Sequence, residues 1–151
     1  MKPLTIGIIG AGRIGKLHAE NLMTRVKGTK LKAVTDPFLD EKWAVSKGIP
    51  VTGKDHRIIL DDSEIDAVLI CSPSSNHAQQ IIDCAQVGKH IFCEKPIAFD
   101  PEVINNSLSK VEKAQVKLQV GFNRRFDPTF ASVREKVSSG ALGDPLSLIH
   151  I

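Results

Sequence analysis

The stretch TIGIIGAGRIGKLHAENL, residues 5–22, decides the fold. Its first five residues are apolar, β-branched or glycine and predict a buried strand, while Ile14, Leu17 and Leu22 carry the spacing of a helix. Between strand and helix lie three glycines in the pattern G-x-G-x-x-G, at positions 10, 12 and 15. Glycine triplets arise by chance, but a strand before them and a helix after them are the context that gives this pattern meaning.

This context predicts a cradle for the pyrophosphate of a dinucleotide. Gly10 permits the tight turn, Gly12 lets the ligand approach the backbone, and Gly15 lets helix and strand pack closely. The free N–H groups and partial positive charge of the helix N-terminus attract phosphate. The cofactor-binding candidates are therefore Gly10, Ala11, Gly12, Arg13, Ile14 and Gly15. The alternative is a glycine-rich turn that binds nothing.

Asp36 ends the second predicted strand, 21 residues after Gly15. A carboxylate at this place accepts hydrogen bonds from the ribose hydroxyls of the cofactor and repels a 2′-phosphate, so the sequence favours NAD over NADP. Pro37 follows, where an Arg or Ser would argue for NADP. The alternative is an ordinary turn-forming Asp before a proline.

Strand-like and helix-like segments alternate along the chain, which predicts an α/β fold with a doubly wound, mostly parallel sheet of the Rossmann type. The predicted strands are Leu4–Ile9, Leu31–Thr35, Ala67–Cys71, His90–Cys93 and Leu118–Gly121, with a weaker one at Ile49–Val51. Their Val/Ile/Leu content indicates helices on both faces.

Three helices have clear signals. The first helix stops at Gly88 and has an apolar face made of Ala78, Ile81, Ile82 and Ala85. The second has Asp100 as N-cap and Pro101 at its first position, and its apolar side carries Ile104, Leu108 and Val111. The third runs from Pro128 to Ser139 and ends at Gly140.

Composition narrows the class of protein. The 151 residues carry 20 Lys+Arg against 17 Asp+Glu, without the basic stripe that nucleic-acid binding needs, and without an apolar run long enough to span a membrane. Cys71, Cys84 and Cys93 lack metal-ligand spacing and predict reduced, buried thiols in a cytoplasmic protein, with no metal site.

Further motifs add a family resemblance. Gly88-Lys89-His90 precedes Cys93-Glu94-Lys95-Pro96, and the run from Val120 to Asp127 reads VGFNRRFD. With the glycine motif upstream, the chain resembles the Gfo/Idh/MocA oxidoreductase family, and its inositol branch in particular. The resemblance implies an NAD-binding domain at residues 1–123 and, at residues 124–151, a linking helix and the first strand, Leu146–Ile151, of a truncated α+β domain for substrate binding and oligomerisation. The full-length protein is accordingly expected to form homo-oligomers.

The resemblance also implies a reaction. NAD oxidises a secondary alcohol of a polyol, with myo-inositol going to its 2-keto form as the favoured case, and Lys95 binds the reacting hydroxyl and takes part in proton transfer. Family members pair this lysine with an Asp and a His from the second domain, so the 151 residues are expected to bind NAD but not to turn over substrate. The alternatives are another NAD(P) oxidoreductase of sugars or amino sugars in the family, and a non-catalytic NAD-sensing module. No nucleic-acid or membrane partner is expected.

Physical reasoning supports Lys95. It follows a strand that ends at the carboxyl edge of the sheet, where ligands bind, and Pro96 holds it extended. The alternative is a surface lysine before a turn. We also predict a cis Lys95–Pro96 peptide bond, which the resemblance suggests.

The remaining candidates come from the same resemblance. Ser72, Pro73, Asn76, His77 and Glu94 are expected along the ribose and nicotinamide side of the cofactor, and Asn123 and Arg124 close over cofactor or substrate. His77 could equally be a solvated histidine. We expect His18 to be a packing or surface residue and Arg125 to pair with a carboxylate.

Overall fold

The computed structural model describes residues 2–145 and divides into two compact units, residues 1–121 and 122–151. The predicted strand Leu146–Ile151 lies outside the described residues. Each unit is described by itself below.

The first unit contains a six-stranded parallel sheet. Its strands are β1 (Leu4–Ile9), β2 (Thr29–Thr35), β3 (Val51–Gly53), β4 (Ala67–Ile70), β5 (His90–Cys93) and β6 (Leu118–Val120), in the order β3-β2-β1-β4-β5-β6. The connections run one way from β1 to β3 and the other way from β4 to β6, so the order reverses between β1 and β4. Open α/β sheets bind ligands at the carboxyl ends of the strands on either side of such a reversal.

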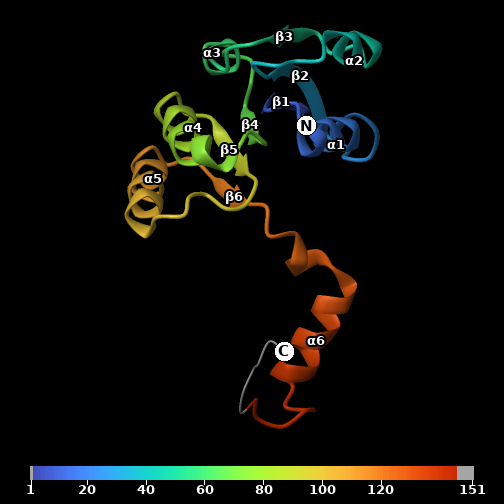
Figure 1. Cartoon of the computed structure of the whole chain (residues 1–151), viewed down its shortest axis with the longest axis vertical. Helices are drawn as coiled ribbons and strands as arrows, with labels where there is room; N and C mark the ends of the chain where they lie inside the picture. The colour runs from blue at the N-terminus through green and yellow to red at the C-terminus, as the bar shows by residue number, and fades with distance from the viewer. Residues whose placement is uncertain (1, 146–151) are drawn as a thin grey trace. The chain divides into compact units, whose positions relative to one another are not determined.

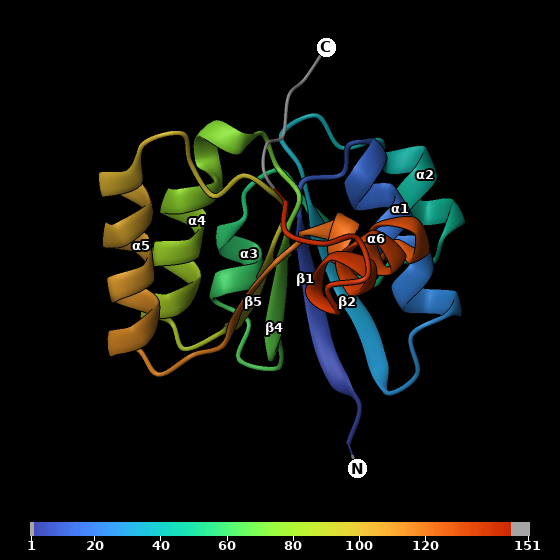
Figure 2. The ribbon, with the colours of Figure 1, turned by 90° about the horizontal axis from the view of Figure 1, so that it is seen from below.

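Helices cover both faces of this sheet. They are α1 (Arg13–Thr24), α2 (Glu41–Ser46), α3 (Arg57–Leu60), α4 (Ser74–Gln86) and α5 (Pro101–Lys113), labelled in Figure 1. Figure 2 shows α1 and α2 on one side of the strands and α3, α4 and α5 on the other. The buried apolar side chains accordingly form two clusters, one around Ile8, Ala19 and Val34 and the other around Ile59, Ile70 and Ile81. The predicted doubly wound α/β fold is confirmed.

The predicted elements differ from the structure in a few places. The weak strand at Ile49–Val51 is shifted to Val51–Gly53, because pairing with β2 begins where Val51 meets Ala33. Helix α5 does not bury Leu108, which is 41% exposed; Ser107 is buried in its place, with its hydroxyl donating to the Ile104 carbonyl. Helices α2 and α3 are too short to give a periodic signal.

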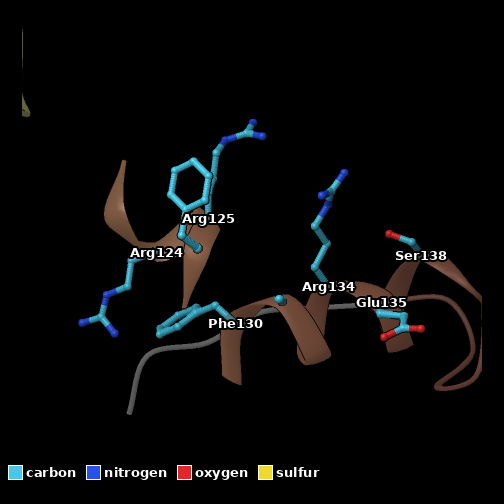
Figure 3. A pocket seen from close by; sticks show the side chains of 8 residues that line it. Arg124, Arg125, Phe130, Arg134, Glu135 and Ser138 are labelled. Carbon is cyan, nitrogen blue, oxygen red and sulfur yellow. The ribbon is translucent and has the colours of Figure 1, made fainter. Parts of the chain in front are cut away.

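The second unit begins with the 3-10 helix η1 (Asn123–Phe126) and continues as α6 (Pro128–Ser138). The Asp127 carboxylate caps α6 by accepting from two backbone N–H groups, and Gly140 ends it with φ of 74°. Figure 3 shows three arginines and Phe130 around a cavity of about 670 Å³ in this unit. The Arg124 guanidinium lies 4.5 Å from the Phe130 ring centre. Within residues 122–145 no carboxylate lies within ion-pair distance of Arg125, and its ion pair stays a prediction.

The three cysteines are free thiols, as predicted. Cys84 and Cys93 are buried and Cys71 is half-buried. Burial raises the pKa of each thiol to about 12. In residues 2–145 no helix combines the length and the apolar character that crossing a bilayer requires, and no cluster of His, Cys, Asp or Glu is arranged to hold a metal ion.

Candidate active site

Of the three motif glycines in the turn after β1, two have no room for a side chain and one does. Gly10 has φ of 96°, and a Cβ there would run into the backbone of Cys71 and Ser72. A Cβ on Gly15 would collide with the Gly10 carbonyl. Gly12 differs, because apart from Gly12 itself and the two residues beside it no heavy atom of the described chain lies within 4 Å of where its Cβ would stand. Gly10 and Gly15 therefore serve the fold of the turn, and Gly12 leaves space beside the start of α1.

Asp36 is fixed against this turn. Its Oδ2 accepts a hydrogen bond from the Ala11 N–H at 2.7 Å and its Oδ1 accepts one from the Phe38 N–H at 2.8 Å. The Ala11 N–H, a predicted phosphate donor, is thus occupied by Asp36. Each carboxylate oxygen keeps a further lone pair for a ligand hydroxyl. The carboxylate is oriented before any ligand arrives.

A cavity of about 500 Å³ joins the turn to Asp36. Its lining comes from the carboxyl ends of β1 to β4 and from the start of α4: Ile9, Gly10, Gly12, Thr35, Asp36, Pro37, Phe38, Lys54, His56, Cys71, Ser72, Pro73, Asn76 and Gln80. The buried Thr35 hydroxyl has no hydrogen-bond partner within the described residues. The predicted residues Gly10, Gly12, Asp36, Ser72 and Pro73 all lie in this lining. A cavity that joins a glycine cradle to a fixed carboxylate fits a dinucleotide.

Sequence reasoning missed several lining residues. Lys54 and His56 follow β3, which was predicted only weakly, and Phe38 is 93% exposed next to Pro37. The rule that places ligands at the carboxyl ends of strands could have found Lys54 and His56 once β3 was set at its correct residues. Gln80 lies two turns into α4 and carried no signal of its own.

The Glu94-Lys95-Pro96 segment follows β5 at the same edge of the sheet. The Glu94 N–H donates to the Ile70 carbonyl, which extends the β4–β5 pairing by one bond. Lys95 is exposed, and the predicted cis peptide bond between Lys95 and Pro96 is present. Glu94 and Lys95 are not part of the cavity lining, so they lie one strand beyond it, on the side of Ser72 and Pro73.

The Glu94 carboxylate contacts a histidine from α1. His18 Nε2 lies 2.9 Å from Glu94 Oε1, and the His18 ring packs edge-on against Phe92 with ring centres 5.4 Å apart. The predicted packing role of His18 is confirmed. The contact links the helix that begins at the glycine turn to the residue before Lys95.

His77 is buried rather than solvated. Its side chain is 1% exposed, with Nδ1 2.7 Å from the Pro96 carbonyl and Nε2 2.8 Å from the Ser72 carbonyl. Because both ring nitrogens face protein carbonyls, the ring offers no free polar atom to a cofactor. One turn later, Gln80 Oε1 accepts a 2.6 Å hydrogen bond from the Ser72 hydroxyl.

Lys89, in the Gly88-Lys89-His90 motif, has a structural place. Its ammonium is buried and donates to the carbonyls of Asp62 and Ile65 at 2.7 and 2.9 Å. Burial lowers the pKa of Lys89. Asn123 and Arg124 belong to the second unit, and their contact with a cofactor stays a prediction.

The sheet order, the glycine turn and the carboxylate at the end of β2 together define a dinucleotide-binding domain of the Rossmann type. Comparison with known families is more specific. The family model described as "Oxidoreductase family, NAD-binding Rossmann fold" matches residues 4–122, and the chain belongs to this family, Gfo/Idh/MocA.

Individual relatives share most of this chain. The uncharacterized oxidoreductase YrbE of Bacillus subtilis is 47% identical over 95% of the chain and 42% of its own length, and the myo-inositol 2-dehydrogenase of Thermotoga maritima is 38% identical over 94% and 43%. The crystal structure of scyllo-inositol dehydrogenase from Lactobacillus casei with NAD(H) and scyllo-inositol matches with a TM-score of 0.88 and 38% identity, covering 95% of this chain and 43% of that one. The chain thus spans less than half the length of the relatives it matches.

Proposed function

We propose that the chain is the NAD-binding half of a dehydrogenase that oxidises a secondary alcohol of a polyol, with inositol as the favoured substrate. One observation carries the proposal: Lys95 stands one strand away from a cavity that joins the glycine turn to Asp36, on the same edge of the sheet. A module that only senses NAD needs the cavity but has no use for an exposed lysine beside it.

The residues of the cavity bind and orient the cofactor. Gly12 leaves room for the pyrophosphate at the N-terminus of α1, and Asp36 accepts hydrogen bonds from the ribose hydroxyls. Ser72 and Pro73, at the end of β4, lie toward the nicotinamide side. When bound, NAD supplies the acceptor for the hydride that leaves the alcohol carbon.

Lys95 acts on the substrate hydroxyl. In its ammonium form it donates a hydrogen bond to the hydroxyl oxygen, and in its neutral form its amine accepts the hydroxyl proton as the alcohol becomes a ketone. Pro96 restricts Lys95 to extended backbone, which limits the directions in which its amine can reach. This role assigns one acid–base group, and further groups that contact the substrate are expected beyond these 151 residues.

The substrate class rests on similarity. Relatives named for myo-inositol and scyllo-inositol match this chain at about 38% identity, which supports a cyclic polyol over another sugar or amino sugar. Assembly of the full-length protein into homo-oligomers, with a second domain providing the interface, is part of the same proposal.

The test measures hydride transfer and its dependence on Lys95. The chain and the full-length gene product, each at high concentration, are mixed with NAD and with myo-inositol or scyllo-inositol, and formation of NADH is followed by its absorbance. We expect the 151 residues to bind NAD without forming NADH, and the full-length gene product to form NADH in a reaction that Lys95→Ala abolishes. Lys117→Ala is the matched control, because Lys117 is an exposed lysine preceding β6, at the opposite edge of the sheet.

Each outcome has a meaning. NADH formation that survives in Lys95→Ala contradicts the assigned role of Lys95. NAD binding with no NADH formation from any polyol, sugar or amino sugar, even in the full-length gene product, favours the sensing module.

A further inference from the structure

The segment that carries Lys95 has few ties to the rest of the protein. The ladder between β4 and β5 ends with the bond from Glu94 N–H to the Ile70 carbonyl. Within residues 2–145, the only hydrogen bond to the backbone of Lys95 or Pro96 is the one that His77 makes to the Pro96 carbonyl. Glu94 is held through His18 and Ile97 packs against the core, so this ring is the tie that acts on Pro96 itself, next to Lys95.

The second contact of His77 is on the cofactor side. Nε2 lies 2.8 Å from the carbonyl of Ser72, a residue of the cavity lining. Ser72 and Pro96 belong to the loops after β4 and β5, which are neighbours in the sheet. One buried ring thus spans the gap between the loop that lines the cavity and the loop that presents the lysine.

We propose that His77 is a positioning residue: its buried ring lies between the Ser72 and Pro96 carbonyls, donates to the Pro96 carbonyl, and so sets where Lys95 lies relative to the bound cofactor. The proposal rests on the proposed function of Lys95. In this proposal His77 does not make the contact with the cofactor that the family resemblance suggested. It acts on Lys95 indirectly, through the backbone carbonyls of Ser72 and Pro96.

Gln80 provides a matched control. It is on the same face of α4, buried to a similar degree, and it also holds Ser72, through the hydroxyl at 2.6 Å. Within residues 2–145 it makes no hydrogen bond to residues 94–97. Gln80→Leu therefore loosens the cavity side alone, whereas His77→Gln and His77→Phe loosen the link between the two loops.

The test reads the position of Lys95 directly. Parent and variants are treated with an amine-acetylating reagent, with and without NAD at equal fractional occupancy, and acetylation of Lys95 and Lys117 is measured by mass spectrometry. Amide hydrogen exchange of Glu94, whose N–H donates to the Ile70 carbonyl, is measured in parallel. Thermal melts establish that each variant is folded, and if His77→Phe does not fold, His77→Gln decides.

We expect NAD to protect Lys95 in the parent and in Gln80→Leu, and to protect it about fivefold less in His77→Gln, the factor that one lost hydrogen bond gives. Exchange at the Glu94 N–H rises by a similar factor in the His77 variants alone, and acetylation of Lys117 is insensitive to NAD throughout. Protection and exchange in His77→Gln equal to those in Gln80→Leu overturn the positioning role and leave the proposed function intact. Absence of protection by NAD in the parent overturns the proposed function, and this proposal with it.

Discussion

The substitution Gly12→Ala adds one methyl group, and it distinguishes the role of Gly12 in folding the glycine turn from its role in binding the ligand. Gly12 has φ of −69° and ψ of −171°, a conformation open to any residue, and the space where its Cβ would stand is empty. Gly12→Ala therefore strains nothing in the protein. The methyl group stands instead in the space that we assign to the pyrophosphate.

The effect on stability follows from two opposing terms. Alanine loses less chain entropy than glycine on folding, which stabilises by about 0.4–1 kcal/mol. Glycine is the better N-cap, and its replacement at the start of α1 costs a similar amount. The net change in the free energy of unfolding is within about 0.5 kcal/mol, a shift of about 2 °C in the melting temperature.

The effect on affinity is much larger. A hydrogen bond from a backbone N–H to a charged phosphate contributes about 1.5–3 kcal/mol, and pushing the phosphate away from one such donor weakens binding by about 10- to 100-fold. Calorimetric titration with NAD measures this loss, and a melt of the same sample measures stability.

Gly28→Ala is the control, because it is expected to lower stability without changing NAD affinity. Gly28 has φ of 77° and precedes β2, at the amino edge of the sheet away from the cavity. Alanine there costs about 1–2 kcal/mol of stability through the left-handed backbone and leaves NAD affinity unchanged. If Gly12→Ala binds NAD within twofold of the parent, or loses as much stability as Gly28→Ala, the assignment of this space to the pyrophosphate is wrong.

Three further predictions concern cofactor choice, the thiols and acid stability. Asp36→Ala is expected to shrink the preference for NAD over NADP, because it removes the carboxylate that repels a 2′-phosphate; paired titrations measure the ratio, and equal affinities in the parent would contradict the argument. With each thiol pKa raised to about 12 by burial, the cysteines are expected to react with a disulfide reagent at pH 8 only as the chain unfolds, and rapid labelling of the native protein would refute this. Hydrogen bonding to Lys32 lowers the pKa of Asp62 in the folded protein. The Asp62 carboxylate therefore stabilises the fold above its unfolded pKa of about 3.9, and this stabilisation is lost as the pH falls through the lowered folded pKa. Urea unfolding in this acid range should show a smaller loss of stability in Asp62→Asn than in the parent.

The sequence contained most of the fold because local patterns specify local structure. A strand followed by G-x-G-x-x-G and a helix has few alternatives, and this motif alone placed the turn, the start of α1 and the strand before it. The cap Asp100 fixed the start of α5 to the residue, since a side-chain acceptor is useful only next to free backbone N–H groups. Asp36 was found for a similar reason, because the position of a residue at the end of a strand is a local property.

Only the tertiary structure decided which side chains meet. His77 meets Pro96 19 residues away, and His18 meets Glu94 76 residues away. Each pairing depends on which elements lie side by side, and the order of the strands is not written in any single segment. Periodicity likewise shows that one side of a helix is buried without showing where a neighbour comes closest, so α5 buries Ser107 where a leucine was expected. The family resemblance placed His77 along the cofactor, and packing between two loops gave its ring both of its partners.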